Sequence, residues 1–282
     1  MMETQILAVM GSPASGKTMT SLKIATLLSK AKKNVIIVHL EPTCPVIPYI
    51  LSGEIPHDVS LGELLTKMQL SQDEILGALT PVPNKEYISV LGYKLGESIS
   101  SYPKIVPSKV VDFFVMLRGL ADYIIVDCST VIEADVSTII ALQFADEVLK
   151  LGTSDLKGIS YFYTADRLLA DSKFKKEKNV FAISNLKEGQ EWENVAQQYG
   201  GVQYVLPYCK ELEEQVNELR VFEKLTEEKS SSYNFELAKL VNGIFRVDLP
   251  ELATKKKEKA HTKATKERRS LRMPFSKNKG EF

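Results

Sequence analysis

Eight residues near the N-terminus, GSPASGKT at Gly11–Thr18, constrain the fold of this chain more than any other feature. They match the pattern G-x-x-x-x-G-K-[S/T] in full, and they stand between an apolar run and an amphipathic one. Small residues let backbone N–H groups curl around an anion, and the N-terminus of a following helix adds its positive dipole end. The segment therefore predicts a strand, a phosphate-binding loop and a helix, in that order. A chance match in a turn rich in glycine and serine is the alternative, which the flanking patterns disfavour.

This loop also predicts which groups hold a nucleotide. We expect the Lys17 ammonium to reach the β- and γ-phosphates of ATP and the Thr18 hydroxyl to coordinate Mg²⁺. ATP and Mg²⁺ are therefore the cofactors that the motif implies. The predicted nucleotide-binding segment comprises Gly11, Ser12, Pro13, Ala14, Ser15, Gly16, Lys17, Thr18 and Met19.

Short apolar runs alternate with longer amphipathic runs along most of the chain, a pattern typical of βα units. We expect an α/β protein with a P-loop NTPase fold, in which a mostly parallel central sheet of about seven or eight strands has helices on both faces. The predicted strands are Gln5–Met10, Asn34–Leu40, Tyr87–Leu91, Tyr123–Asp127, Glu147–Leu151, Val180–Ser184 and Val202–Leu206. The predicted helices are Lys17–Ala31, Leu61–Lys67, Asp73–Leu79, Ser108–Leu120, Ile132–Phe144, Asp155–Leu169, Trp192–Tyr199, Glu211–Leu225 and Tyr233–Phe245.

An acidic residue suited to Mg²⁺ follows another apolar strand. The segment ADYIIVDCST places Asp127 at the carboxyl end of that strand, where ligands bind in open α/β sheets. A phosphate loop of this type works together with such an acid. The alternative is that Asp127 only caps the helix that follows.

These motifs resemble those of the MinD/ParA family of P-loop ATPases, over about residues 5–245. In NVIIVHLEPTCPVIPYIL, Glu41 stands where the family usually places a catalytic aspartate that orients the attacking water. A glutamate retains that chemistry with a longer reach. The resemblance implies that Lys17, Glu41 and Asp127 are the catalytic residues. It also implies that Thr18, Glu41 and Asp127 lie around the metal.

The resemblance extends to the part of the site that would hold the adenine base. In FAISNLKEG, Asn185 stands where the family contacts adenine. The segment VQYVLPYCKELEEQV is similar to the family's last strand and base-side loop, which includes Pro207.

Three departures from the family pattern bear on hydrolysis. The family's second lysine, which follows the first glycine of the loop and reaches the partner's nucleotide across a dimer, is replaced by Ser12 and followed by Pro13. A charge of that kind is worth about 10³–10⁵ in rate. His39 stands where many relatives have a first aspartate, and the CST after Asp127 lacks their small Gly/Pro turn. We expect His39 to be a packed, hydrogen-bonded structural residue, with a general base as the alternative.

These departures predict a slow ATPase and are most typical of the TadZ/CpaE-type branch. The resemblance implies a localisation or assembly factor for pilus, secretion or conjugation machinery or for DNA, whose nucleotide state controls homodimerisation. The alternatives are a nucleotide-binding scaffold without useful turnover, a plasmid or chromosome partition ATPase, and a small-molecule kinase or ligase. The sequence does not identify the partner machine.

Charge divides the chain into two parts. Residues 251–282 contain 11 basic and 4 acidic residues, a balance of +7, which leaves −7 for the rest. We expect an ATPase domain at 1–249 and a basic, disordered tail at 250–282 that contacts DNA or anionic membrane lipid. A solubilising tail is the alternative.

The expected location is cytoplasmic, because the three cysteines lack metal or disulfide spacing and no apolar run has membrane length. If the tail binds lipid, we expect the protein to be peripheral at the inner face of the membrane.

Removing residues 251–282 should leave folding and ATP affinity unchanged and weaken binding to DNA or to anionic liposomes. If the contact is to duplex DNA, neutralising about six to eight phosphates predicts a slope of about −5 to −7 in log affinity against log salt. If it is to lipid, binding should vanish on neutral liposomes. Equal binding of full-length and truncated protein on both surfaces would contradict either contact.

Overall fold

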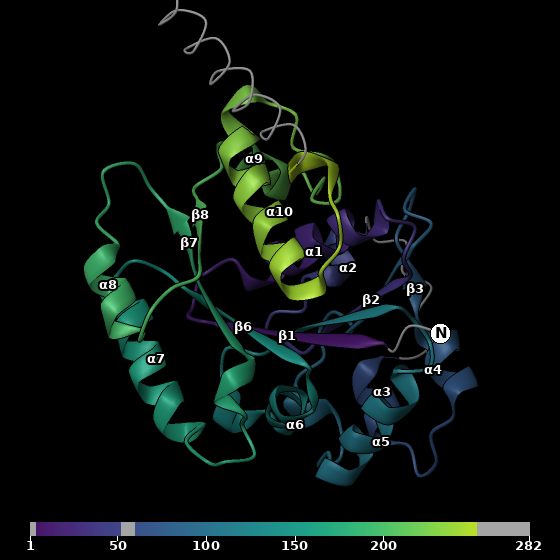
Figure 1. Ribbon diagram of the computed structural model, residues 1–282. Helices are drawn as coiled ribbons and strands as arrows, with labels where there is room; N and C mark the ends of the chain where they lie inside the picture. The colour runs from purple at the N-terminus through teal and green to yellow at the C-terminus, as the bar shows by residue number, and fades with distance from the viewer. Residues whose placement is uncertain (1–3, 52–59, 253–282) are drawn as a thin grey trace, which may run out of the picture.

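A single sheet runs through the centre of the computed structural model, which describes residues 4–51 and 60–252 (Figure 1). Its eight strands lie in the order β3-β4-β2-β5-β1-β6-β7-β8. The strands are β1 (Gln5–Gly11), β2 (Val35–His39), β3 (Thr80–Pro81), β4 (Ile88–Leu91), β5 (Tyr123–Asp127), β6 (Glu147–Gly152), β7 (Asn179–Leu186) and β8 (Tyr204–Pro207). Every neighbouring pair is parallel except β3 and β4.

Helices cover the sheet on both faces. The α-helices are α1 (Lys17–Ser29), α2 (Ile47–Ile50), α3 (Leu61–Thr66), α4 (Gln72–Ala78), α5 (Pro107–Leu117), α6 (Val136–Phe144), α7 (Leu156–Leu168), α8 (Glu193–Gln198), α9 (Lys210–Asn217) and α10 (Ser231–Phe245). Short 3₁₀ turns occur at η1 (Ile99–Ser101), η2 (Ile132–Ala134), η3 (Lys176–Lys178) and η4 (Glu228–Ser230). Figure 1 shows α1, α2, α9 and α10 on one side of the sheet and α3, α5, α6 and α7 on the other.

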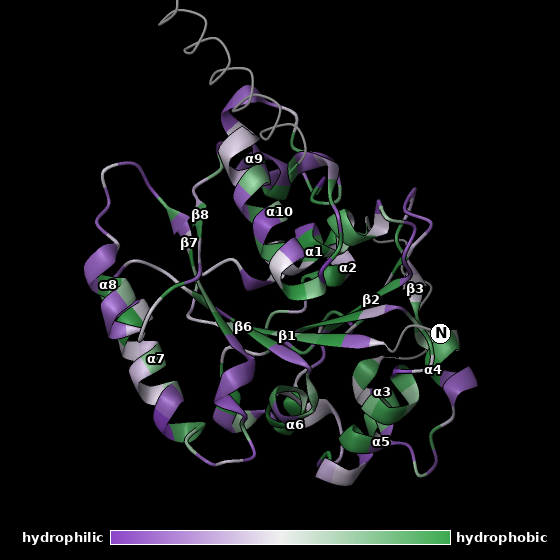
Figure 2. Cartoon of the chain, in the orientation of Figure 1, coloured by the Kyte–Doolittle hydropathy of each residue, from purple (hydrophilic) through white to green (hydrophobic). Residues whose placement is uncertain are grey.

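The alternation of side chains along β1 explains why both faces are covered. Ile6 and Met10 belong to the apolar core under α5 and α6, whereas Leu7 and Val9 belong to the core under α1 and α10. All of them are fully buried, because successive side chains of a strand point to opposite faces. Figure 2 shows that the central strands are coloured largely as hydrophobic.

The predicted fold class is confirmed, and the seven predicted strands are present, along with the antiparallel two-residue strand β3, which was not predicted. The predicted helix Glu211–Leu225 is wrong in length, because α9 ends at Asn217. Leu219 has a φ of 59°, a left-handed conformation that no α-helix continues through. The short helix α2 was also not predicted.

The packed part of the chain extends slightly beyond the predicted boundary at residue 249. Pro250, Glu251 and Leu252 have helical backbone, and Leu252 packs against the core under α10. Glu251 also pairs with Lys30 at the end of α1. The rest of the predicted tail, residues 253–282, lies outside the described residues. Within the described part of the chain, no helix is both long and apolar enough to span a bilayer.

Candidate nucleotide-binding site

The predicted site residues meet where β1, β2 and β5 end. Strand β1 lies between β5 and β6, so the loop after β1 sits where the chain order of the sheet changes direction. This is the topological switch point, and open α/β sheets bind ligands in the crevice outside it. Residues from β2, β5, β7 and β8 reach the same edge of the sheet.

The loop Gly11–Thr18 needs its two glycines. A Cβ on Gly11 would lie 2.3 Å from the Leu151 carbonyl oxygen and 2.7 Å from Ser15 Oγ. Gly16, the N-cap of α1, has a φ of +74°, which favours glycine. The loop is fixed from outside as well, because the Ser184 hydroxyl donates to the Ser15 carbonyl oxygen at 2.7 Å.

Lys17 and Thr18 in the first turn of α1 both point to the end of β5. Thr18 Oγ1 donates to Asp127 Oδ2 at 2.6 Å, and Lys17 Nζ donates to Thr130 Oγ1 at 2.6 Å. Burial lowers the pKa of Lys17, and the nearby carboxylates of Asp127 and Glu41 oppose that shift. The ammonium therefore sits in a poorly solvated position where a phosphate anion would stabilise its charge.

His39 completes this group from the neighbouring strand. Its Nδ1 lies 2.7 Å from Asp127 Oδ2, and both side chains are buried. Because an ionised carboxylate only accepts hydrogen bonds, His39 Nδ1 is the donor. The expectation that His39 is buried and hydrogen-bonded is confirmed. That its partner would be Asp127 was not foreseen.

The residues present fit a magnesium ion bound together with nucleotide phosphates. Asp127 Oδ1 is buried and has no hydrogen-bond partner among the described residues. In the described part of the chain, no group of three or more His, Cys, Asp or Glu side chains could hold a metal. Mg²⁺ commonly keeps several waters and uses one or two protein oxygens plus substrate phosphates, so Thr18 and Asp127 suffice on the protein side.

Glu41 contacts the segment that follows β5. Its Oε2 accepts from Ser129 Oγ and from the Thr130 backbone N–H, both at 3.4 Å. Of the three predicted metal-linked residues, Thr18 and Asp127 are thus in direct contact, whereas Glu41 contacts the loop between them and α6. Its carboxylate is half-exposed and makes no hydrogen bond to Thr18 or Asp127 among the contacts of the described residues.

A cavity of about 190 Å³ opens beside the phosphate loop. It is lined by predicted residues of the loop and the base side, namely Ala14, Ser15, Gly16, Met19, Asn185 and Pro207. The other wall includes Tyr208, Leu212, Glu213 and Val216, which belong to the segment similar to the family's base-side loop. It also includes Tyr233, which sequence reasoning did not single out. The mixture of apolar and polar groups beside a phosphate cradle suits a nucleobase.

A larger cavity, of about 450 Å³, lies elsewhere, between β6, α7 and η3. Its buried Lys150 is paired with Asp166 at 2.8 Å, and its lining includes no residue of the phosphate loop. Of the two cavities, the smaller one is therefore the one bordered by the predicted phosphate-binding residues.

Ser12, at the position of the family's second lysine, faces inward. It is fully buried, and its Oγ lies 3.4 Å from Thr153 Oγ1. Its backbone N–H donates to the Leu151 carbonyl oxygen at 3.1 Å, which ties this position to β6. A side chain held this way does not reach the surface of the protein.

The fold is that of a P-loop NTPase, and solved structures of ParA and MinD proteins share it. A ParA family ATPase from Chlorobium tepidum TLS matches with a TM-score of 0.69 and 12% identity, over 86% of this chain and 98% of that one. The cell division ATPase MinD of Pyrococcus furiosus matches with a TM-score of 0.66 and 17% identity, over 85% and 99%. MinD of Pyrococcus horikoshii OT3, complexed with Mg-ADP, matches with a TM-score of 0.65 and 17% identity, over 86% and 96%.

No protein-family model matches the chain, and the curated proteins that were compared give no match either. At identities of 12% and 17%, the structural likeness establishes the fold alone. The function has to be inferred from the residues of the site.

Proposed function

We propose that this protein is a MinD/ParA-like ATPase that binds Mg-ATP in the loop Gly11–Thr18 and hydrolyses it slowly. The observation that carries the proposal is the contact between Thr18 Oγ1 and Asp127 Oδ2 beside Lys17. That arrangement pairs a phosphate-binding ammonium with a metal-binding hydroxyl and carboxylate. The Mg-ADP complex of the similar P. horikoshii MinD supports the choice of ligand.

In this proposal each residue has one task. Backbone N–H groups of the loop and Lys17 would hold the phosphates, and Thr18 with Asp127 would hold Mg²⁺, which neutralises phosphate charge when it is bound. The hydrogen bond from His39 would orient the Asp127 carboxylate. Asn185 and Pro207 would contact the adenine base.

Glu41 would orient the attacking water and accept its proton. Its contacts with Ser129 Oγ and the Thr130 N–H place it beside the segment that Lys17 also contacts. The buried, inward-facing Ser12 favours slow turnover, because no cation at that position can stabilise the transition state on a partner's nucleotide.

The biological role we propose is that of a localisation or assembly factor of TadZ/CpaE character, cytoplasmic and peripheral at the inner face of the membrane. It would serve a pilus, secretion or conjugation machine, or DNA, through a nucleotide-dependent homodimer. The inward-facing Ser12 also favours a second candidate, a nucleotide-binding scaffold with no useful turnover. A partition ATPase remains an alternative role for the same site.

We predict that wild-type protein binds Mg-ATP with micromolar affinity and that Lys17→Ala weakens this binding by at least about 1.5 kcal/mol, the scale of a hydrogen bond to a charged group. The reason is that Lys17 supplies the mobile positive charge of the loop. Titration of a fluorescent ATP analogue measures both affinities. Lys176→Ala, at an exposed lysine of η3, is the matched control and should bind like wild type. Equal affinities for wild type and Lys17→Ala would remove the assignment.

We predict a turnover well below the typical enzyme value of about 10 s⁻¹, and its loss in Glu41→Ala. The carboxylate that orients the water is removed, whereas the phosphate cradle is unchanged. A single-turnover assay under saturating Mg-ATP makes the measurement, with Glu177→Ala at an exposed glutamate of η3 as the control. Full activity in Glu41→Ala would refute this role. Absence of any hydrolysis in wild type that nevertheless binds ATP would favour the scaffold.

A further inference from the structure

Helix α9 forms one wall of the nucleotide cavity, and its two faces differ. Leu212, Glu213 and Val216 line the cavity. Glu211 and Gln215, one turn apart, are the buried residues of α9. Leu212 and Val216 also pack against the core under α1 and α10, so apolar contacts and buried polar side chains hold this wall together. The buried polar side chains add hydrogen bonds that fix where the helix lies.

Glu211 binds the helix to the segment that follows it. Its carboxylate accepts from the backbone N–H groups of Thr226, at 2.7 Å, and Glu227, at 3.0 Å, and from the Ser230 hydroxyl. The backbone carbonyl oxygen of Gln215 accepts from the backbone N–H of Arg220 at 2.7 Å. These bonds join α9 and residues 218–230 into one unit.

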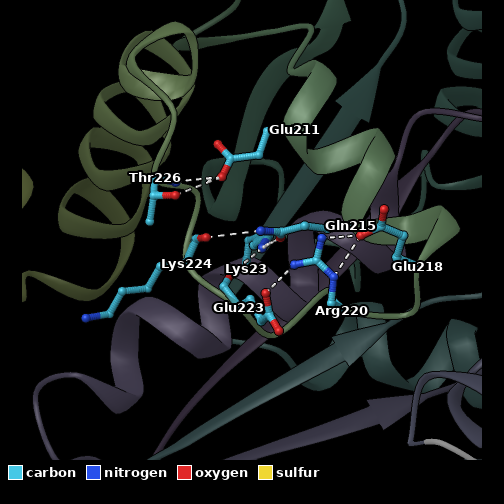
Figure 3. Close-up of polar contacts among 8 residues, drawn as sticks. All are labelled: Lys23, Glu211, Gln215, Glu218, Arg220, Glu223, Lys224 and Thr226. Carbon is cyan, nitrogen blue, oxygen red and sulfur yellow. Dashed lines mark hydrogen bonds and ion pairs between the residues drawn. The ribbon is translucent and has the colours of Figure 1, made fainter.

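Lys23 joins that unit to α1 (Figure 3). Its Nζ donates to Gln215 Oε1 at 2.6 Å and to the Glu223 carbonyl oxygen at 2.7 Å. Gln215 in turn donates to the Lys224 carbonyl oxygen at 3.0 Å. On the outer side, Arg220 pairs with the carboxylates of Glu218 and Glu223. Lys23 therefore forms the buried contact between this unit and α1, the helix that also carries Lys17 and Thr18.

Burying the Lys23 ammonium costs free energy, which its contacts must offset. Lys23 is only 4% exposed, and its two acceptors are an amide and a carbonyl oxygen. Burial lowers its pKa to about 8, while Cys209, Glu211 and Glu223 oppose the shift. A buried ammonium without a carboxylate in direct contact depends on those two hydrogen bonds.

We propose that Lys23 is a positioning residue that holds α9 against α1 and thereby sets the affinity for the base and ribose of the bound nucleoside triphosphate. This inference rests on the proposed nucleotide-binding function. Phosphate binding belongs to Gly11–Thr18 and does not involve α9. Loss of the Lys23 link should therefore weaken the contacts to the nucleoside part and spare the contacts to the phosphates.

The experiment compares two ligands, Mg-ATP and Mg-tripolyphosphate, each competing with a fluorescent ATP analogue for the full-length protein. Lys23→Met keeps most of the side-chain stem and removes the ammonium. Gln215→Met removes the acceptor from the other end, which keeps the test open if one variant does not fold. Lys30→Met is the control, because this lysine at the C-terminal end of α1 pairs with Glu251.

We expect Lys23→Met and Gln215→Met to bind Mg-ATP about tenfold more weakly, the scale of one buried hydrogen-bonding group left unsatisfied. Their affinity for Mg-tripolyphosphate should stay within about twofold of wild type on the same scale, as should both affinities of Lys30→Met. Unchanged Mg-ATP affinity, or an equal loss for both ligands, would overturn the inference. If wild type itself bound neither ligand, the proposed function would fail and the inference with it.

Discussion

One buried carboxylate joins the three strand ends on which the site depends. Asp127, at the end of β5, accepts from Thr18 in the helix after β1 and from His39 at the end of β2. The sheet register makes this possible, since Val9 and His39 are both aligned with Asp127 across the two neighbouring strands. A shift of one residue in either pair would send a side chain to the other face of the sheet. The parallel core and the phosphate site are therefore specified together.

The phosphate side of the site could be predicted from the sequence because its determinants are local. The spacing from Gly11 to Thr18 dictates a loop whose conformation lies within a few residues, and an apolar strand places Asp127 at the same edge. The orientation of His39 required the strand order, in which β5 lies between β2 and β1. No local pattern encodes that order, so the sequence identified His39 as packed without revealing its partner.

The base side could be predicted only in part. Asn185, near the end of β7, and Pro207, the last residue of β8, both line the cavity beside the loop. The buried contacts that hold α9 in place could not be predicted, because they join residues up to 200 positions apart, as between Lys23 and Glu223. A polar pattern such as KELEEQVNELR favours a longer helix by propensity, yet the bonds of Gln215 to residues 220–224 turn the chain back after Asn217. Tertiary hydrogen bonds thus override local preference here.

The most direct test of the central claim is a crystal structure with Mg²⁺ and a non-hydrolysable ATP analogue. We expect the phosphates within the loop Gly11–Thr18, with Lys17 Nζ moved from Thr130 Oγ1 to phosphate oxygens and Thr18 released from Asp127 toward the metal. The base should lie in the cavity beside Asn185. Phosphates bound at any other place, or Lys17 still bonded to Thr130 in the presence of the nucleotide, would contradict the account.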